Sequence, residues 1–545
     1  MIKGGTAMKV LVIGGIAGGP SFATRLRRIN EDDEIIIFER GAAISVASCA
    51  IPYYLGGVVS DRSKLIERTP EVLKQRNNID VRLFNEVTAI NPTDKSVMVK
   101  NLKTGDVYQE NYDQLVIATG ASPVVPPIKG IENAGNAFVL RAITDADKLM
   151  TYLAAKRPKT VTILGAGAIG IEVAEAFVRR QMDVTIVDQA DQVASPYDPE
   201  IASIVKDELI KQGVHVILNN GIKEIRNNGH TLVFEDGSLH QTAMLFLGTG
   251  VRPNSQLAEA AGINLSPDHH VIVDDHLQTN LPDIYAIGDV IETTSLINGL
   301  PIPSVLSSPA NRQGHLLADI MTDAPVTYKG FIGAGVAKFF DLTASYVGYT
   351  ESALKKLGIT NYKTVFITPY DQAYFFPNAD RVNFKLIYEE KTGKLLGGQA
   401  VGKHGIDKRI AELSVAITGN LTAFDLPALE IPYSPPYSST RDVLNIAGYV
   451  AIRELTNKSK IVKASAIPAE DRQNAFFLDI REPGTEPAGS ITPTANIPLS
   501  QLRDRIEEIP KDKKIYITFR KGIGPYNASR ILDGKGYNVT TIDES

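Results

Sequence analysis

The sequence is poor in cysteine, and Cys49 is the only one in 545 residues. One thiol cannot form an internal disulfide, and it excludes a disulfide scaffold and a zinc site built from thiolates. Any redox chemistry at Cys49 must therefore use a partner from outside the chain. A single cysteine also fits a reducing compartment, so we expect a cytoplasmic protein. We also expect no metal site.

A strong charge of one sign and long hydrophobic runs are also missing. The formal net charge is -5, which gives no reason to expect nucleic acid or an anionic membrane as a partner. No segment has the ~20 consecutive apolar residues of a membrane helix, and residues 1–8 lack an apolar signal region. With 43% hydrophobic and 22% charged residues, the composition is typical of a soluble α/β protein, and the length predicts roughly three or four domains.

A first nucleotide-binding pattern occupies residues 9–39. A strand over residues 9–13 leads into the loop Gly14-Gly15-Ile16-Ala17-Gly18-Gly19 and a helix, and a second strand ends on Glu39. This order is typical of a βαβ dinucleotide fold, in which glycines admit a pyrophosphate, the helix N-terminus offers free N–H groups and the acid accepts ribose hydroxyls. Ile16 replaces the middle glycine of GxGxxG, so this copy is the weaker of two.

A second, complete pattern follows at residues 160–188. Gly165, Gly167 and Gly170 have the required spacing, and a strand ends on Asp188 about 20 residues later. A carboxylate at Asp188 suits a free 2′-hydroxyl and repels a 2′-phosphate, so we expect NADH rather than NADPH. The alternative for each copy is a surface βαβ unit with a chance glycine pattern, which the presence of two copies disfavours.

Further segments resemble those of a known family. Residues 112–120, which end on Ala118-Thr119-Gly120, and residues 279–289, which end on Asp289, resemble accessory motifs of the pyridine nucleotide-disulfide oxidoreductase family. The resemblance covers residues 8 to about 450, and residues 246–254 mark the return from the second fold to the first. It implies that the first fold binds FAD, that the second binds NAD(P)H, and that Asp289 holds the ribityl and pyrophosphate region of FAD.

The resemblance also implies which residues contact each cofactor. The residues expected at FAD are Gly14, Gly15, Ala17, Gly18, Gly19, Glu39, Arg40, Ala118, Thr119, Gly120, Asp289 and Ala310. The residues expected at NADH are Gly165, Gly167, Gly170, Glu172, Asp188 and Gly250. Glu172 matches a family glutamate near the nicotinamide, and its alternative role is a plain acid on a helix surface.

The expected fold class is α/β, with two Rossmann-like domains, an α+β dimerisation domain and a small C-terminal α/β domain. The expected ranges are 8–122 and 251–330 for a discontinuous FAD-binding domain, 123–250 for the NAD-binding domain, 331–450 for the dimerisation domain, 451–464 for a charged linker and 465–545 for the C-terminal domain. In the family, the dimerisation domain closes each active site with residues of the partner subunit. We therefore expect a homodimer.

The surroundings of Cys49 discriminate between the reactions of this family. Most disulfide reductases carry CxxxxC, but Tyr54 stands five residues after Cys49 and excludes a dithiol. NADH oxidases and peroxidases, which cycle a sulfenic acid, resemble GxxHxG where this chain has Ala17. Residues 45–57 instead resemble the signature SxxxCxxPYYxGG of CoA-disulfide reductases, which form a mixed disulfide between cysteine and CoA.

The resemblance to the CoA branch implies a substrate site and a mechanism. NADH would reduce FAD, FAD would reduce the sulfur of Cys49, and the Cys49 thiolate would attack CoA persulfide or CoA disulfide. The flavin and the helix that follows Cys49 would each favour the thiolate. Arg25 and Arg28, one helical turn apart, could take CoA phosphates, and Ser45 and Ser48 could contact CoA near the thiol; the alternative for the arginines is a solvated helix face.

Two tyrosines are expected to help CoA leave. Tyr437 matches a family tyrosine that enters from the partner subunit and protonates or orients the leaving CoA thiolate. A second tyrosine is expected near residues 372–377, where this chain has Tyr374 followed by Phe375 and Phe376. This departure favours a persulfide, because its HS⁻ leaving group needs less help from an acid, but both substrates stay open.

The last 80 or so residues resemble a rhodanese domain, on residues 477–482, 491–502 and 515–530. The active loop of that domain reads CxxGxR, but here Phe519 replaces the cysteine and Gly524 the arginine. We therefore expect no sulfur transfer by that route and a domain that supports the dimer, shields the active site or helps to bind CoA. Arg520 and Lys521 leave anion binding as a further hypothesis.

The leading hypothesis is an FAD-dependent, NADH-driven reductase of CoA persulfide or CoA disulfide. A rival is an NADH oxidase or peroxidase that cycles a Cys49 sulfenate, which the absence of a histidine at Ala17 disfavours. A hypothesis of another class is a flavin-bound redox sensor or scaffold that recruits a sulfur-carrying partner.

Overall fold

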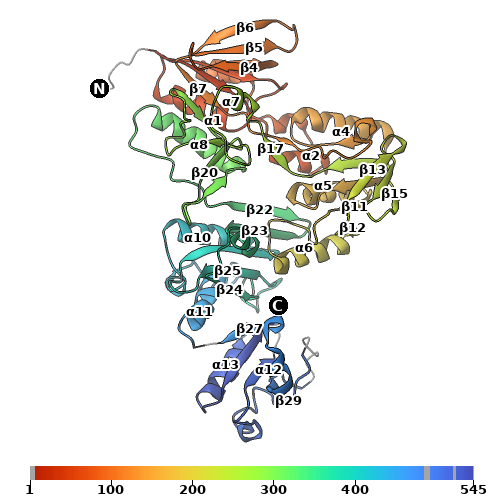
Figure 1. The fold of residues 1–545 in the computed structure, drawn as a ribbon, viewed down its shortest axis with the longest axis vertical. Helices are drawn as coiled ribbons and strands as arrows, with labels where there is room; N and C mark the ends of the chain where they lie inside the picture. Colours follow the sequence, from red (N-terminus) through yellow and green to blue (C-terminus); the bar gives the residue numbers. More distant parts are fainter. Residues whose placement is uncertain (1–6, 459, 484–490, 519–522, 544–545) are drawn as a thin grey trace. The chain divides into compact units, whose positions relative to one another are not determined.

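The computed structural model describes residues 7–458, 460–483, 491–518 and 523–543 (Figure 1). The chain divides into two compact units. The first consists of Met1–Ser195 and Val205–Gly333, and the second of Pro196–Ile204 and Ala334–Ser545.

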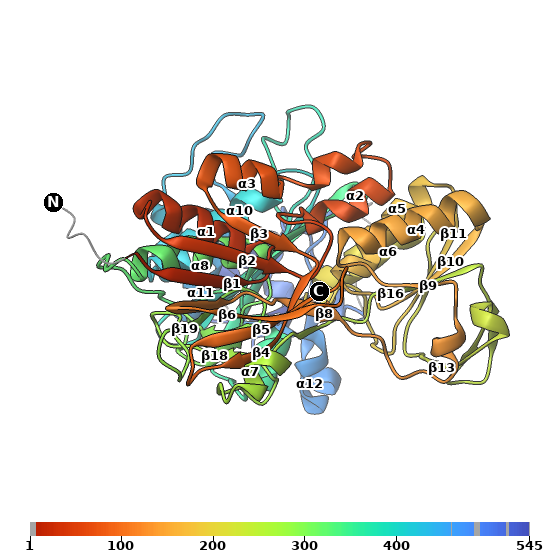
Figure 2. The same cartoon turned by 90° about the horizontal axis from the view of Figure 1, so that it is seen from above.

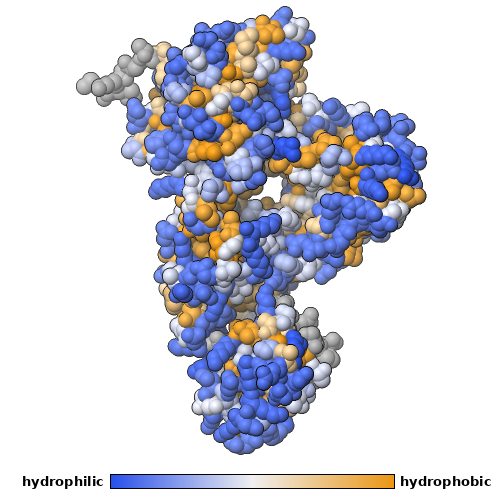
Figure 3. Space-filling model, viewed as in Figure 1, coloured by the Kyte–Doolittle hydropathy of each residue, from blue (hydrophilic) through white to orange (hydrophobic). Residues whose placement is uncertain are grey.

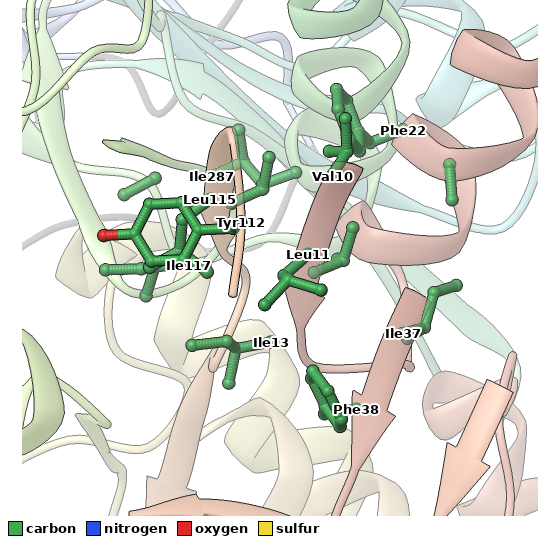
Figure 4. Close-up of a cluster of buried hydrophobic side chains, with 14 of the residues drawn as sticks. Val10, Leu11, Ile13, Phe22, Ile37, Phe38, Tyr112, Leu115, Ile117 and Ile287 are labelled. Carbon is green, nitrogen blue, oxygen red and sulfur yellow. The ribbon is translucent and has the colours of Figure 1, made fainter. Parts of the chain in front are cut away.

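The first unit contains a five-stranded parallel sheet with the order β19-β7-β1-β2-β3. The strands are β1 (Lys9–Ile13), β2 (Glu34–Glu39), β3 (Asp80–Leu83), β7 (Gln114–Ile117) and β19 (Ile284–Ala286). Helices α1 (Gly18–Ile29) and α8 (Ser307–Ile320) lie side by side (Figures 1 and 2). Strands β1, β2 and β7 are nearly continuous hydrophobic runs because this part of the sheet is buried on both faces. The resulting core includes Val10, Leu11, Phe22, Ile37, Phe38 and Leu115 (Figure 4).

A second parallel sheet of the same unit has the order β12-β11-β10-β16-β9. Its strands are β9 (Ala137–Phe138), β10 (Thr160–Leu164), β11 (Asp183–Val187), β12 (His215–Ile217) and β16 (Met244–Leu247). Helices α4 (Ile143–Lys156) and α5 (Ala168–Arg179) belong to this part of the chain. The two short strands β8 (Ala121–Pro123) and β17 (Val251–Pro253) pair antiparallel, so the chain leaves the first sheet and returns to it at one place.

Small sheets and helices complete the first unit. The remaining strands are β4 (Asn85–Asn91), β5 (Ser96–Asn101), β6 (Val107–Asn111), β13 (Ile222–Arg226), β14 (Thr231–Phe234), β15 (Leu239–Gln241), β18 (Val271–Ile272), β20 (Ile291–Thr294) and β21 (Pro301–Pro303). The remaining helices are α2 (Ile51–Leu55), α3 (Pro70–Asn77) and α7 (Gln256–Ala260). Helix α6 (Pro199–Lys211) begins in the second unit and ends in the first.

The second unit contains an antiparallel sheet with the order β22-β23-β26-β25-β24. Its strands are β22 (Ala334–Phe339), β23 (Leu342–Gly348), β24 (Tyr362–Ile367), β25 (Asn383–Glu389) and β26 (Leu395–Gly402), and its helices are α9 (Glu351–Lys356), α10 (Ile406–Thr418) and α11 (Val443–Leu455). The ammonium of Lys385, on β25, lies 3.0 Å from carboxylate oxygens of Asp198 and Glu200 and 2.5 Å from Glu351. The Lys385 side chain is only 1% exposed, so this cluster is held together by buried ion pairs.

A parallel sheet with the order β27-β31-β30-β28-β29 forms the C-terminal part of the second unit. Its strands are β27 (Ile461–Lys463), β28 (Phe476–Asp479), β29 (Ala495–Asn496), β30 (Ile515–Thr518) and β31 (Val539–Asp543), with helices α12 (Ala469–Asn474) and α13 (Ile523–Asp533). The predicted linker over residues 451–464 is therefore too long. Residues 451–455 continue α11, because Ala451 is buried on its inner face, and residues 461–463 pair with β31.

Among the described residues, no helix has the length and apolar composition needed to cross a membrane. The face drawn in Figure 3 is mostly hydrophilic, with hydrophobic residues in separate patches.

Candidate active site

The first glycine loop joins β1 to α1 next to the carboxylate of Glu39. The N–H of Gly14 donates to the carbonyl of Phe38 at 2.9 Å. The Glu39 carboxylate accepts the N–H of Gly15 at 2.8 Å and that of Gly41 at 2.6 Å. Because a carboxylate has about four lone-pair positions, Glu39 keeps acceptor capacity for ribose hydroxyls.

The second glycine loop repeats this arrangement between β10 and α5. The N–H of Gly165 donates to Val187 O at 2.8 Å. The Asp188 carboxylate accepts the N–H of Ala166 at 2.7 Å and that of Ala190 at 2.9 Å. Glu39 and Asp188 thus occupy equivalent positions in two copies of one local structure.

The glycines of both loops fit the backbone approach that a dinucleotide requires. A Cβ on Gly19 would lie 2.1 Å from Gly14 O, and a Cβ on Gly170 would lie 2.0 Å from Gly165 O. These two glycines therefore allow the helix to pack against the loop. A Cβ on Gly167 would meet no atom within 4 Å, so packing does not require glycine there and the position is open for a pyrophosphate.

The expected flavin segments converge beside the first loop. A Cβ on Gly14 would lie 2.1 Å from Ala118 O. Asp289 forms an ion pair with Arg141, with Oδ2 and Nη2 2.7 Å apart. The same Nη2 atom would lie 3.7 Å from a Cβ on Gly120. Arg141 has no local sequence signal, because it precedes α4 and is 148 positions from Asp289.

The other expected cofactor residues lie around these segments. A Cβ on Gly18 would lie 3.3 Å from Ala310 O, which ties α1 to α8, and Ala17 immediately precedes α1. Thr119 Oγ1 donates to Asn254 O at 2.8 Å. Two expected residues make few contacts with their neighbours. The exposed side chain of Arg40 lies 3.8 Å from Glu86. Gly250 has a φ of +95°, and a Cβ there would meet no atom within 4 Å.

Cys49 is exposed and lies in a single 3-10 turn, Ser48–Ala50, directly before α2. Its Sγ atom lies 3.5 Å from Oγ of Ser307, the first residue of α8. Helix α2 spans only five residues. Because a helix dipole is the sum of aligned peptide dipoles, α2 is too short for the stabilising effect that the sequence predicted for the helix after Cys49.

Helix α2 packs closely on α5 of the second nucleotide-binding fold. A Cβ on Gly56 would lie 3.2 Å from Ala176 Cα. Burial, followed by repulsion from the Glu175 carboxylate, raises the pKa of Glu172 to about 7. Burial also raises the pKa of Tyr53, with further contributions from the charges of Glu172, Glu175 and Cys49. Glu172 therefore lies near the segment that carries Cys49 and holds a proton up to neutral pH.

The residues expected to contact CoA have different environments. Arg25 Nη2 lies 2.6 Å from the Asp319 carboxylate, whereas Arg28 is exposed and donates only to Thr24 O, at 3.0 Å. The backbone N–H of Ser45, with a φ of +51°, donates to Gly15 O at 2.8 Å. This bond joins the cysteine segment to the first glycine loop. Ser48, next to Cys49, is half-buried, and its Oγ lies 3.5 Å from the carbonyl oxygen of Val46.

The two expected tyrosines lie on adjacent loops of the second unit. Tyr374 is 76% exposed and Tyr437 is 70% exposed. The N–H of Ala373 donates to Pro435 O at 3.1 Å, and Lys408 Nζ donates to Tyr437 O at 2.9 Å. Buried Arg409 adds a second tie, because it donates to Asp371 O at 2.7 Å and pairs with Asp442 at 2.9 Å.

Comparisons with known proteins match this geometry. The family model described as "pyridine nucleotide-disulphide oxidoreductase" matches residues 8–306, and the model of the dimerisation domain of the same family matches residues 335–443. The chain belongs to the pyridine nucleotide-disulphide oxidoreductase family. Pyridine nucleotide-disulphide oxidoreductases use FAD and NAD(P)H, and both glycine loops of this chain fit such dinucleotides.

Three relatives cover most of this oxidoreductase. A coenzyme A disulfide reductase of Staphylococcus aureus strain bovine RF122 / ET3-1 is 35% identical over 444 residues, which are 81% of this chain and 99% of the relative. The structure of reduced Bacillus anthracis CoADR-RHD has a TM-score of 0.97 and 42% identity, covering 99% of this chain and 97% of that chain. An NAD-dependent persulfide reductase from A. fulgidus has a TM-score of 0.90 and 33% identity, covering 99% of both chains. The mixed α/β fold, including its C-terminal domain, is thus shared with known oxidoreductases.

The rhodanese-like loop falls largely outside the described residues. Phe519, Arg520 and Lys521 lie there, whereas Gly524 is in the first turn of α13.

Proposed function

We propose that this oxidoreductase uses NADH to reduce CoA disulfide, CoA persulfide or both through Cys49. The observation that carries the proposal is the position of its single, exposed thiol on a segment that contacts both nucleotide-binding folds. The Ser45 backbone joins this segment to the first glycine loop, and Gly56 packs on α5. The names of the Staphylococcus aureus and A. fulgidus relatives give coenzyme A disulfide for the first and a persulfide for the second.

The cofactor assignment follows the two equivalent carboxylates. Glu39 and the first loop would hold FAD with Asp289, and Asp188 and the second loop would hold NADH. Bound together, these cofactors supply two electrons to a sulfur group. The Asp188 carboxylate, beside two backbone N–H groups, favours a neutral ribose hydroxyl over the negatively charged 2′-phosphate of NADPH.

The proposed sulfur chemistry proceeds through one mixed disulfide. The Cys49 thiolate attacks one sulfur of CoA disulfide, a bond forms between Cys49 and CoA, and the other CoA leaves as a thiolate. With CoA persulfide, attack on the sulfur that is bonded to CoA releases HS⁻ instead. Two electrons then cleave the mixed disulfide, so Cys49 returns to the thiolate and CoA leaves. Each cycle therefore consumes one NADH and one proton and yields NAD⁺ and two sulfur products, either two CoA molecules or one CoA and one hydrogen sulfide.

The proposed CoA contacts lie on α1 and on the cysteine segment. Arg28 is exposed and free to meet a phosphate, whereas Arg25 already uses Nε and Nη2 on Asp319. A guanidinium has five N–H donors, so Arg25 can hold Asp319 and a phosphate together. Of the two serines on the cysteine segment, Ser45 is buried and Ser48 is half-buried next to the thiol, so Ser48 is the better placed to contact CoA.

The proposed assembly is a homodimer. The dimerisation domain is shared with the family, and Tyr374 and Tyr437 present exposed rings on two loops that are tied to each other. An exposed phenol is suited to enter the active site of a partner subunit and protonate the leaving CoA thiolate. We also propose a cytoplasmic location, in keeping with a single reduced cysteine, and a supporting role for the C-terminal domain without sulfur transfer.

Replacing Cys49 by Ser tests this proposal. We expect Cys49→Ser to reduce turnover of CoA disulfide and CoA persulfide to background while NADH still bleaches the flavin absorbance, because the thiol acts after flavin reduction. NADH oxidation under anaerobic conditions measures turnover, and mass spectrometry of wild-type protein treated with CoA disulfide should show one CoA attached. Turnover that survives in Cys49→Ser would refute the proposed nucleophile.

Comparing NADH with NADPH tests the cofactor preference, and comparing the CoA substrates with O₂ tests the proposed oxidant. The wild-type enzyme should have a higher kcat/KM with NADH than with NADPH, and Asp188→Ser should narrow that ratio by about tenfold, since one charge repulsion of about 1.4 kcal/mol is removed. If O₂ reoxidises the reduced enzyme faster than both CoA substrates do, the chain is an oxidase and the proposed function is wrong.

A further inference from the structure

The contact between Cys49 and Ser307 joins residues 258 positions apart in the sequence. The Cys49 Sγ and Ser307 Oγ atoms lie 3.5 Å apart, a distance that suits a hydrogen bond to sulfur. Ser307 opens α8, a helix of 14 residues. The thiol is thus placed at the N-terminus of a long helix, in contrast to its position before the short α2.

The first turn of α8 presents hydrogen-bond donors toward this end. Leu306 occupies the N-cap position and makes no side-chain cap hydrogen bond, and the first N–H groups of any helix have no partner within that helix. Pro309 has no N–H to contribute, so the first two N–H groups of this helix belong to Ser307 and Ser308. Negative charge is stabilised at such a helix end.

The position of Ser307 is fixed by the packing of α8 on α1. The Asn311 side chain donates to Ser307 O at 3.1 Å. Ser21, on α1, donates from its hydroxyl to Asn311 O at 2.9 Å. A chain of hydrogen bonds therefore runs from the helix after the first glycine loop to the residue that contacts the thiol.

We propose that Ser307 is a catalytic residue that donates its hydroxyl hydrogen bond to the Cys49 thiolate and orients the sulfur for attack. The proposal rests on the proposed function of Cys49 as nucleophile. A thiolate forms at Cys49 whenever the mixed disulfide is cleaved, and a charged acceptor strengthens the hydrogen bond that it receives. The hydroxyl donates without taking up a proton itself, so the sulfur stays available as an anion for the next attack.

Ser307 also supplies a polar contact to the thiol that Ala17, at the position where NADH oxidases and peroxidases have a histidine, cannot supply. Ala17 cannot contact the thiol through a polar atom, whereas Ser307 supplies one from a different helix. A serine hydroxyl is a far weaker base than imidazole. Ser307 therefore suits a cycle between thiolate and mixed disulfide, which needs a donor, better than a peroxidase cycle, which needs a group that accepts a proton.

Alkylation of the unique thiol tests the proposal directly. The FAD-loaded wild type, Ser307→Ala, Ser307→Thr and the matched control Ser308→Ala are treated with iodoacetamide at pH 7 and at about pH 10, without NADH or CoA. Loss of the hydrogen bond should reduce the thiolate fraction of Ser307→Ala about tenfold. Because the thiolate of a more basic thiol is a better nucleophile, its rate constant for alkylation should rise about threefold. We therefore expect about threefold slower alkylation at pH 7 and no slowing at about pH 10.

The control variants separate the hydroxyl from the helix end. Ser307→Thr keeps the hydroxyl and should stay within twofold of the wild type, and Ser308→Ala should leave the rate unchanged. Equal rates for Ser307→Ala and the wild type, or equal slowing by Ser308→Ala, would overturn the proposal. FAD content and thermal stability, measured on every variant, identify a variant that fails to fold, and Ser307→Gly then supplies a second removal of the hydroxyl.

The outcome is independent of the proposed substrate. If Ser307→Ala slows alkylation but CoA disulfide never adds CoA to Cys49, the role of Ser307 stands and the proposed function fails. If CoA adds normally to every variant and alkylation is unaffected, the proposed function stands and the role of Ser307 is wrong.

Discussion

The half-buried carboxyl group of Glu172 makes the stability of the first unit depend on pH. Its pKa is raised from 4.5 to about 7, first by burial and then by the Glu175 carboxylate. Below pH 4.5 the group is protonated in the folded and unfolded states, so it costs nothing. As pH rises toward 7, only the unfolded chain ionises, and stability is lost. A difference of about 2.5 pH units corresponds to about 3 kcal/mol, at 1.36 kcal/mol per unit.

Replacing Glu172 by Gln removes this ionisation and keeps the shape of the side chain. We expect Glu172→Gln to match the wild type near pH 4.5 and to exceed its free energy of unfolding by up to about 3 kcal/mol at pH 8. Urea unfolding of the FAD-loaded enzyme, followed by flavin fluorescence at fixed free FAD, measures the difference at each pH. Exposed Glu259 on α7 provides the control, and Glu259→Gln should stay within about 0.5 kcal/mol. A stability difference for Glu172→Gln that does not change with pH would refute the reasoning.

Two further predictions concern packing and buried charge. Gly170→Ala should lower the melting temperature, because its Cβ would lie 2.0 Å from Gly165 O. Gly167→Ala should keep the melting temperature, because its Cβ meets no protein atom within 4 Å, and should raise the KM for NADH, because the Cβ would occupy the space proposed for the pyrophosphate. Equal melting temperatures for the two variants would contradict this reasoning. Lys385→Met should destabilise the second unit by about 3–5 kcal/mol in calorimetry, since it leaves the buried carboxylate of Asp198 without its cation, and an unchanged transition would contradict the pairing.

The sequence predicted the parts of the fold that depend on local patterns. Both glycine loops and the acids Glu39 and Asp188 lie where their spacing placed them, because a βαβ unit determines its own geometry over about 30 residues. The family resemblance then supplied the fold class, with two Rossmann-like folds, a dimerisation domain and a C-terminal domain. The linker was misjudged because charged residues such as Arg453 were taken as solvated, whereas Arg453 belongs to α11 and lies 3.8 Å above the ring of Tyr526.

Contacts between distant segments could not be predicted in this way. Arg141 meets Asp289 across 148 positions, and Cys49 meets Ser307 across 258. Neither Arg141 nor Ser307 has a local pattern, because each is recruited by the packing of whole helices. The signal that could have identified Ser307 was the serine and proline of residues 307–309, which are typical of a helix N-terminus, together with the need of a lone thiolate for a donor.

The origin of the groups around Cys49 explains how one fold can support different sulfur chemistries. The cysteine segment supplies the nucleophile, and Tyr54 stands where a second cysteine would make a dithiol. The contact at the sulfur comes instead from α8, whose position follows from its packing on α1. A substitution at the start of α8 can therefore change the reactivity of the thiol while the cysteine segment and both glycine loops stay intact. The residues that decide the reaction thus lie partly outside the cysteine segment by which the reaction was predicted.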